Sequence, residues 1–79
     1  MASENLSSRE LPYSTEAEKA VLGGIMLKNE TWDIISDLVK EDDFHKEEHK
    51  LIYRTINNLQ DEGKPVDVIT VQEAIAVSY

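Results

Sequence analysis

Apolar residues recur at helical spacing near the start of the chain and predict a first amphipathic helix. The repeating apolar positions are Ala17, Ala20, Val21, Ile25 and Leu27. They follow the 3.6-residue period of an α-helix. One face of this segment is therefore expected to turn toward a core.

The start of this helix is compatible with two registers. Thr15 and Glu18 have the spacing of a capping box, in which each side chain accepts a hydrogen bond from the other's backbone N–H. Ser14 is an alternative N-cap, one residue earlier. Pro12 biases the residue before it away from helix. Residues 1–11 are mostly polar and have no period, so we predict a flexible N-terminal tail there.

Two adjacent glycines, Gly23 and Gly24, lie inside the predicted first helix. A glycine costs roughly 1 kcal/mol relative to alanine in a helix interior. Because the apolar rhythm continues past the pair, we interpret it as a close helix crossing in which a side chain would clash. The alternatives are that the helix simply tolerates the two glycines or that it breaks at them.

A second helix is predicted to follow Asn29, a favourable N-cap residue. Glu30 then suits the positive end of the helix dipole. The apolar residues of this segment are predicted to share one face: Trp32, Ile35, Leu38 and Val39, with Ile34 beside them. The acidic run Glu41-Asp42-Asp43 ends the helix and can cap the next one, and Phe44 is expected to enter the core.

A third helix is predicted over about residues 45–61, with His45 helping to begin it. Its apolar stripe consists of His49, Ile52, Ile56 and Leu59, with Leu51 and Tyr53 flanking. Gly63 is placed to stop the helix, and Pro65 follows in the expected order.

The last segment combines an extended stretch with a fourth helix. Residues 66–69 are rich in β-branched side chains, but they are too short and solitary for a sheet. Thr70 and Glu73 repeat the capping-box spacing and open a helix. That helix contains Val71, Ala74 and Ile75, and the chain stops at Tyr79, about two turns into it.

These elements predict an all-α fold, a small orthogonal helical bundle of about four helices joined by short loops. A chain of 79 residues has room for one small domain, which we place at residues 12–79. The apolar residues at inward helical positions form the predicted core: Val21, Leu22, Ile25, Ile35, Leu38, Phe44, Ile52, Ile56 and Leu59.

Charge and composition narrow the classes of function. The 16 acidic residues outnumber 8 Lys and Arg, giving a net charge of −8, which works against binding to DNA phosphates. The acidity fits a basic protein partner, or it reflects only the ordinary composition of cytosolic domains. The absence of cysteine excludes disulfides and thiolate metal sites. No apolar run suits a membrane span, and the first residues do not form a signal peptide, so we expect a cytoplasmic location.

No catalytic, cofactor-binding or metal-binding residues are predicted in this chain. Gly23-Gly24 lacks the Gly-Lys-Ser/Thr ending of a phosphate-binding loop. His45 and His49 have the i, i+4 spacing of zinc ligands, but Lys46 occupies the place of the glutamate that a zinc protease requires. His49 is instead expected at the edge of the core, packed and hydrogen-bonded. The carboxylates occur in runs that favour helix caps and solvated faces over catalytic pairs.

Several short segments form a pattern that continues without an evident gap over about residues 12–75. They are Pro12, Ser14, Glu16-Ala17-Glu18, residues 20–27, Asn29-Glu30, Trp32-Asp33, Asp42-Asp43-Phe44, His49-x-x-Ile52-Tyr53, Leu59-x-x-x-Gly63-x-Pro65-Val66-Asp67 and Ile69-Thr70. In this pattern the chain resembles the N-terminal domain of bacterial DnaB-type replicative DNA helicases. It departs from the family at His45, where an aromatic residue is common, and at Tyr53, where Phe is common.

The resemblance implies that the intact protein is a hexameric ring that unwinds DNA at the replication fork. In that family the N-terminal domains form a collar, a trimer of dimers, which helps to assemble the ring and docks the primase. A helicase loader is a further partner to consider. ATP, magnesium and DNA would bind a RecA-like motor domain that this chain does not include. The family's N-terminal domain also continues into a helical hairpin used in dimer contacts, and we expect this chain to stop before it.

Two functions from other classes are alternatives. A free-standing acidic helical adaptor would be supported if the gene ended near Tyr79. A small metal-dependent enzyme would use His45 and His49, and a chain without bound metal would dismiss it. As a helicase domain without a phosphate-binding loop, the chain is expected to show neither ATP turnover nor appreciable binding to duplex DNA.

Overall fold

The computed structural model describes residues 14–78, and all of its regular elements in this range are helical. The predicted tail, residues 1–11, lies outside the described residues. The elements, in chain order, are α1 (Thr15–Leu27), the 3-10 turn η3 (Asn29–Thr31), α2 (Trp32–Leu38), the 3-10 turn η4 (Glu41–Asp43), α3 (Glu47–Asp61) and α4 (Val68–Ser78). The all-α prediction is confirmed.

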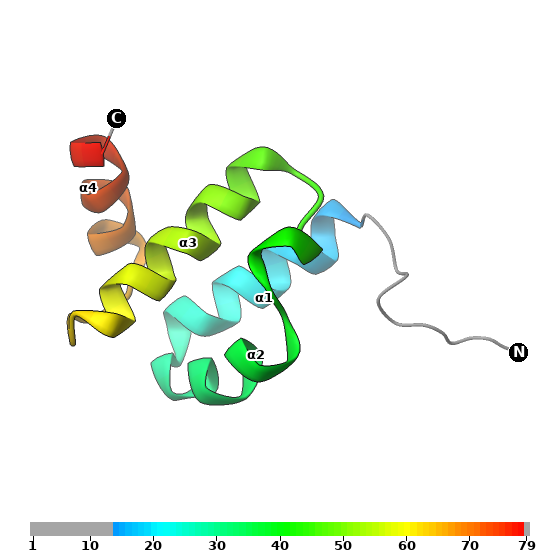
Figure 1. Cartoon of the computed structure of the whole chain (residues 1–79), viewed down its shortest axis with the longest axis horizontal. Helices are drawn as coiled ribbons and strands as arrows, with labels where there is room; N and C mark the ends of the chain where they lie inside the picture. The colour runs from blue at the N-terminus through cyan, green and yellow to red at the C-terminus, as the bar shows by residue number, and fades with distance from the viewer. Residues whose placement is uncertain (1–13, 79) are drawn as a thin grey trace, which may run out of the picture.

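Helix α3 is the centre of the bundle. It contacts α1, α4 and η4, and η3 lies against α1 and α2. Figure 1 shows α1 and α3 running side by side, with α4 standing steeply against α3 at one end and α2 below them. None of the helices within residues 14–78 combines the length and apolarity needed to cross a membrane.

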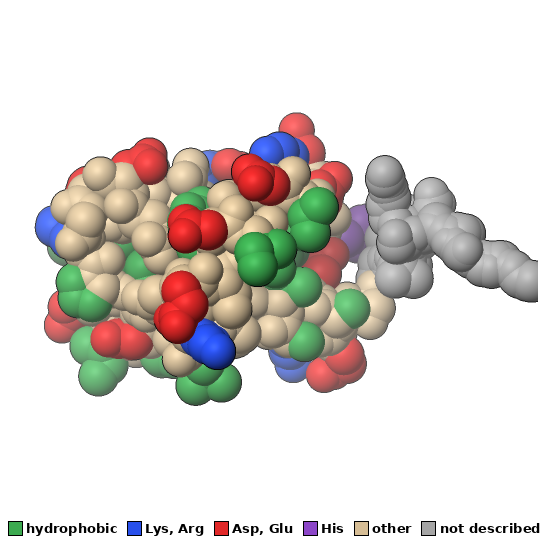
Figure 2. All heavy atoms as spheres, turned by 90° about the horizontal axis from the view of Figure 1, so that it is seen from below, with side chains coloured by type: hydrophobic (Ala, Val, Ile, Leu, Met, Phe, Trp, Pro, Cys, Tyr) green, Lys and Arg blue, Asp and Glu red, His purple; other side chains and the backbone are tan. Residues whose placement is uncertain are grey.

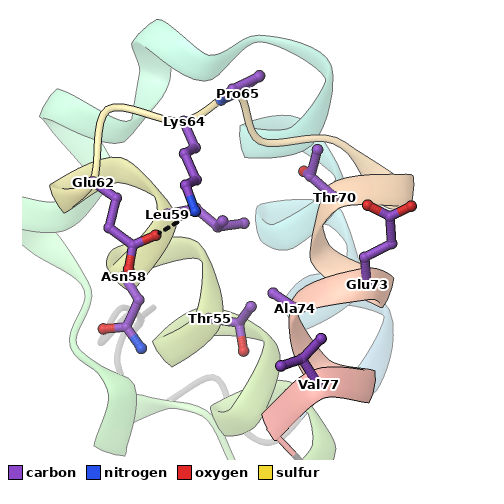
Figure 3. Close-up of a pocket in the computed structure, with 10 residues that line it drawn as sticks. All are labelled: Thr55, Asn58, Leu59, Glu62, Lys64, Pro65, Thr70, Glu73, Ala74 and Val77. Atoms are coloured by element: carbon purple, nitrogen blue, oxygen red, sulfur yellow. Dashed lines mark ion pairs between the residues drawn. The ribbon is translucent and has the colours of Figure 1, made fainter.

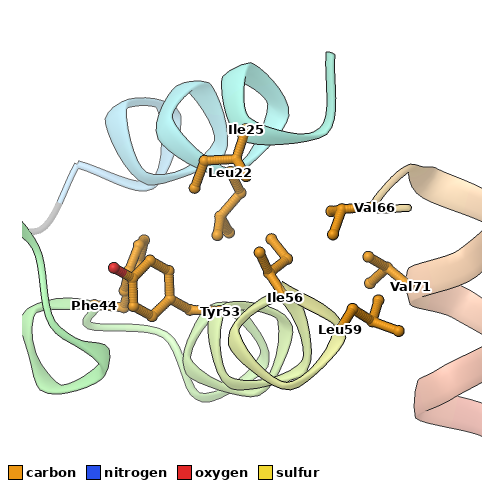
Figure 4. Packing of buried hydrophobic residues seen from close by; sticks show 8 residues of the cluster. All are labelled: Leu22, Ile25, Phe44, Tyr53, Ile56, Leu59, Val66 and Val71. Atoms are coloured by element: carbon orange, nitrogen blue, oxygen red, sulfur yellow. The ribbon is translucent and has the colours of Figure 1, made fainter. Parts of the chain in front are cut away.

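The core forms where α1, α3 and α4 meet (Figure 4). Its buried hydrophobic residues are Leu22, Ile25, Phe44, Tyr53, Ile56, Leu59, Val66 and Val71. Of the predicted core, Val21, Ile35 and Ile52 are partly buried and pack against this cluster. Tyr53, Val66 and Val71 were not among the predicted core residues.

The prediction that Leu38 is a core residue is wrong, because its side chain is 72% exposed. Helix α2 has only 7 residues. The inward positions of this segment are taken by Trp32, Ile35 and Val39, which all pack against the core. A residue at position 38 then points outward, because successive helical residues are rotated by about 100°.

The structure selects one of the two predicted starts of α1 and corrects the starts of two other helices. Ser14 caps α1, since its Oγ accepts from the N–H of Ala17 at 3.1 Å. Helix α3 begins at Glu47 rather than at residue 45. Helix α4 begins at Val68, before the predicted cap at position 70.

A reciprocal pair of hydrogen bonds explains the early start of α4. The N–H of Thr70 donates to Asp67 Oδ1 at 2.9 Å, and the N–H of Asp67 donates to Thr70 Oγ1 at 2.9 Å. These two bonds form a capping box one turn earlier than the predicted Thr70–Glu73 pair. Asp67 and Thr70 have the same three-residue spacing, so the sequence held this signal as well.

Asn29 was predicted to cap α2, but its side chain links two distant segments instead. Its Nδ2 donates to the carbonyl oxygens of Ile25 at 2.9 Å and Val66 at 2.8 Å. Its Oδ1 accepts from the N–H of Val66 at 3.0 Å. These bonds satisfy both polar backbone groups of Val66 and hold the loop before α4 against the end of α1. This contact explains how a residue in an extended stretch becomes buried.

The predicted helix crossing at Gly23 and Gly24 is wrong. A methyl group built on either glycine would meet no atom within 4 Å outside its own stretch of helix. Gly63, in contrast, has a φ of 72°, the left-handed conformation in which glycine ends a helix at low cost. The predicted stop of α3 at Gly63 is therefore confirmed.

Replacing Gly24 with alanine is expected to stabilise the chain by up to about 1 kcal/mol, because alanine has the higher helix propensity. The matched change Gly63→Ala should destabilise it by about 1–2 kcal/mol, since a side chain is strained at a positive φ. Urea unfolding monitored by circular dichroism measures both. A loss of stability in Gly24→Ala would show that the glycine pair does need close approach.

Candidate interaction surfaces

The two histidines considered as zinc ligands have separate roles. The side chain of His49 is buried, with 6% of its surface exposed, and its Nδ1 lies 2.7 Å from Glu18 Oε1. Its ring also meets Phe44 edge to face, with ring centroids 6.5 Å apart. His45 is exposed. Within residues 14–78 there is no group of three side chains that could hold a metal ion. The prediction that His49 is packed and hydrogen-bonded at the core is confirmed.

Glu18 of α1 acts as a cap for the start of α3. Its Oε2 accepts from the backbone N–H of His45 at 2.7 Å, and its Oε1 accepts from that of Lys46 at 3.5 Å. Lys46, the N-cap residue of α3, makes no side-chain capping bond of its own. A carboxylate near a helix N-terminus is favoured by the free N–H groups and the helix dipole. The side chain predicted to cap its own helix therefore caps another one.

The environment of Glu18 favours its ionised form. Burial raises the pKa of Glu18, but the hydrogen bonds from His49 and from the backbone of His45 and Lys46 outweigh this effect. Together they hold the pKa below the ordinary value of 4.5. The ionised Glu18 side chain therefore links α1 to the start of α3, which is a structural role.

A groove of about 460 Å³ lies between α3 and α4 (Figure 3). Its lining residues come from α3, the following loop and α4: Thr55, Asn58, Leu59, Glu62, Lys64, Pro65, Thr70, Glu73, Ala74 and Val77. Lys64 forms an ion pair with Glu62 across one end, at 3.2 Å. The lining combines aliphatic, hydroxyl, amide and charged groups.

A smaller hollow of about 210 Å³ lies beside α2 and α3. The rings of Trp32 and Tyr53 form part of its wall, with centroids 5.2 Å apart. The Tyr53 hydroxyl donates to the carbonyl oxygen of Val39. Arg54 donates two hydrogen bonds to Glu41 Oε2, from Nε at 3.1 Å and from Nη2 at 2.6 Å. These contacts fasten the segment between α2 and α3 to the central helix.

Several large aliphatic side chains are exposed on the described surface. They are Leu27, Ile34, Leu38, Val68, Ile69 and Val77. Figure 2 shows hydrophobic side chains in separate groups, with acidic side chains between them, on the face seen from below. Contiguous exposed aliphatic groups are typical of surfaces that bind other proteins, so neighbouring members of this set are candidates for such a surface.

The fold and these surfaces define a small all-α domain. It has a hydrophobic core, side-chain hydrogen bonds between its segments and exposed aliphatic side chains. Residues 10–78 match the family model described as the DnaB-like helicase N terminal domain. The chain belongs to this family, and the resemblance noted in the sequence is confirmed.

Replicative DNA helicases of several bacteria contain a segment similar to this chain. The chain is 48% identical over 66 residues to the replicative DNA helicase DnaB of Buchnera aphidicola, covering 84% of this chain and 14% of the relative. It is 48% identical over 64 residues to the DnaB of Haemophilus influenzae, covering 81% and 14%. It is 39% identical over 71 residues to the replicative DNA helicase DnaC of Bacillus subtilis, covering 90% and 16%. The chain thus spans about one seventh of the length of its first relatives.

Proposed function

We propose that this chain is the non-catalytic collar domain, residues 12–79, of a hexameric ATP-dependent replicative DNA helicase. The single observation that supports the proposal is the family match, which takes in residues 10–78. The domain would help to assemble the ring through contacts with other copies of itself, and it would dock the primase at the replication fork. A helicase loader would be a further partner.

ATP and magnesium belong, in this proposal, to a motor domain separate from these residues, and DNA is contacted through that domain alone. The net charge of −8 supports this division, because an acidic surface repels the phosphate backbone. The protein would act in the bacterial cytoplasm, near the nucleoid during replication. ATP turnover that follows the purified 79-residue chain would contradict the non-catalytic role.

The isolated chain is expected to be a monomer or a weak dimer and to bind primase far more weakly than a full-length family helicase does. In a ring, the same surface recurs on each subunit, so weak contacts are multiplied by symmetry and by effective concentration. Linking binding sites in this way can raise the overall affinity by a factor on the order of 10²–10⁴ without any new contact.

Sedimentation of the chain alone, and titration of primase into the chain and into the full-length helicase, measure these properties. Equal primase affinities for chain and ring would exclude a contribution from multivalency. A stable hexamer of the 79-residue chain would show that these residues alone assemble the ring. No primase binding to either protein would contradict the docking role.

A further inference from the structure

Helix α2 carries apolar side chains that face the core and others that are exposed. Trp32 and Ile35 pack inward against the core. Away from the core, the side chains of Ile34 and Leu38 are 65% and 72% exposed. Residues four apart in a helix lie on the same face. Ile34 and Leu38 therefore form an exposed aliphatic pair one helical turn apart.

Three exposed carboxylates lie next to this pair: Glu30, Asp33 and Asp37. At about 100° per residue, Asp33 and Asp37 form a row along one side of Ile34 and Leu38, and Glu30 lies one turn before Ile34. None of the three takes part in a salt bridge with another residue in the range 14–78. We call Glu30, Asp33, Ile34, Asp37 and Leu38 the α2 surface.

The neighbouring cations do not neutralise these carboxylates. Lys40, just after α2, directs its Nζ to the backbone oxygen of Ser36 at 2.7 Å. Lys28, just before η3, is exposed and forms no salt bridge with another described residue. The α3–α4 groove differs in this respect, because its Glu62 is already paired with Lys64. Compared with that groove, the α2 surface has more carboxylates without an ion-pair partner among the described residues.

We propose that the α2 surface docks a basic amphipathic helix of a partner protein. Aliphatic side chains of that helix would cover Ile34 and Leu38, and its Lys or Arg side chains would pair with Glu30, Asp33 and Asp37. A second copy of this chain is disfavoured, because two α2 surfaces face to face would bring like charges together. The inference rests on the proposed function, since it gives an interaction domain one of its docking surfaces.

The experiment uses the 79-residue chain and a synthetic helical peptide of about 18 residues, with Leu at i, i+3, i+4 and i+7 spacing and Lys elsewhere. A control peptide has Glu in place of every Lys. Titration is followed by two-dimensional ¹H–¹⁵N NMR and by calorimetry. The Lys peptide should bind, shift the amide signals of residues 30–38 most strongly, and weaken as salt is added. The Glu peptide should not bind.

Matched variants separate this surface from other exposed side chains. The double variant Ile34→Ser/Leu38→Ser should weaken binding of the Lys peptide at least about tenfold, because it removes both aliphatic contacts. Leu27→Ser, at a side chain that is 90% exposed outside this surface, should leave the affinity unchanged. Asp33→Asn/Asp37→Asn should weaken binding and reduce its dependence on salt. All of these positions are exposed, so the variants are expected to fold, which circular dichroism checks.

Three outcomes would overturn the proposal. They are equal binding of the Lys and Glu peptides, an equal loss of affinity in Leu27→Ser, and amide shifts centred on the α3–α4 groove. Sedimentation supplies a fourth: if the chain self-associates and Ile34→Ser/Leu38→Ser abolishes it, a second copy occupies the surface. Primase binding by the unmodified chain is measured separately. The proposed helix binding at the α2 surface can therefore be disproved while the proposed docking of primase is still supported.

Discussion

Replacing Ile56 with alanine is expected to lower the free energy of unfolding by about 2–5 kcal/mol. The Ile56 side chain is fully buried, at 0% exposure, and it lies on the central helix between α1 and the loop before α4 (Figure 4). Alanine would remove methyl and methylene groups from the core and leave a cavity that the neighbours cannot fill completely. In a small domain this loss is a large share of the total stability.

Urea unfolding followed by circular dichroism measures the effect, and Leu38→Ala is the matched control. Both substitutions remove aliphatic groups from a helix, but the Leu38 side chain is 72% exposed. The control should change the free energy of unfolding by no more than about 0.5 kcal/mol. Equal losses in the two variants would mean that the assignment of inward and outward positions is wrong.

Replacing Glu18 with alanine is expected to destabilise the chain by about 1.5–3 kcal/mol, the range for hydrogen bonds to a charged group. The substitution leaves the imidazole of His49 without its carboxylate partner, and the N–H of His45 without its acceptor. Glu16→Ala is the control, because the Glu16 side chain is 85% exposed and pairs only loosely with Lys19 at 3.7 Å. A loss in Glu16→Ala as large as that in Glu18→Ala would contradict the capping role of Glu18.

The contribution of Glu18 should also depend on pH. Because its pKa is held below the ordinary value of 4.5 in the folded chain, the unfolded chain binds its proton more readily. The stabilisation is therefore complete above the unfolded pKa and is lost as the pH falls through the lower, folded pKa. The difference in unfolding free energy between wild type and Glu18→Gln should be larger at about pH 7 than at about pH 3. A difference that grew on acidification would contradict this assignment.

The apolar pattern of the sequence was sufficient to predict where most helices lie. Amphipathic periodicity is a local property, and it correctly placed the stripe of α3 and the entry of Phe44 into the core. The stripe predicted for α1 is wrong in part, because Ala17, Ala20 and Leu27 are exposed. Gly63 was likewise identified from its neighbours, because a positive φ at a helix end is set by the chain next to it. The family pattern could also be found without coordinates, since it depends on the identity and order of residues.

The errors at the helix ends have a different origin. Capping residues compete for the same few backbone N–H groups, so several registers are compatible with one sequence. The capping-box spacing of Thr15 and Glu18 is real, but the Glu18 carboxylate finds its hydrogen-bond partners 27 and 31 residues away, at the backbone N–H of His45 and the ring of His49. Periodicity within one segment does not reveal a partner at that distance.

The sequence by itself determined the helices, the stop at Gly63 and the family, because each depends on residues close together in the chain or on their order. The tertiary structure decided which of the remaining apolar side chains face the core. Val66 is buried because Asn29, 37 residues away, binds both of its polar backbone groups. Leu38 and Ile34 remain exposed because the short helix α2 packs on the core through Trp32 and Ile35. Burial depends on which helices come together, and that is set by the sum of many contacts between distant residues rather than by any one segment.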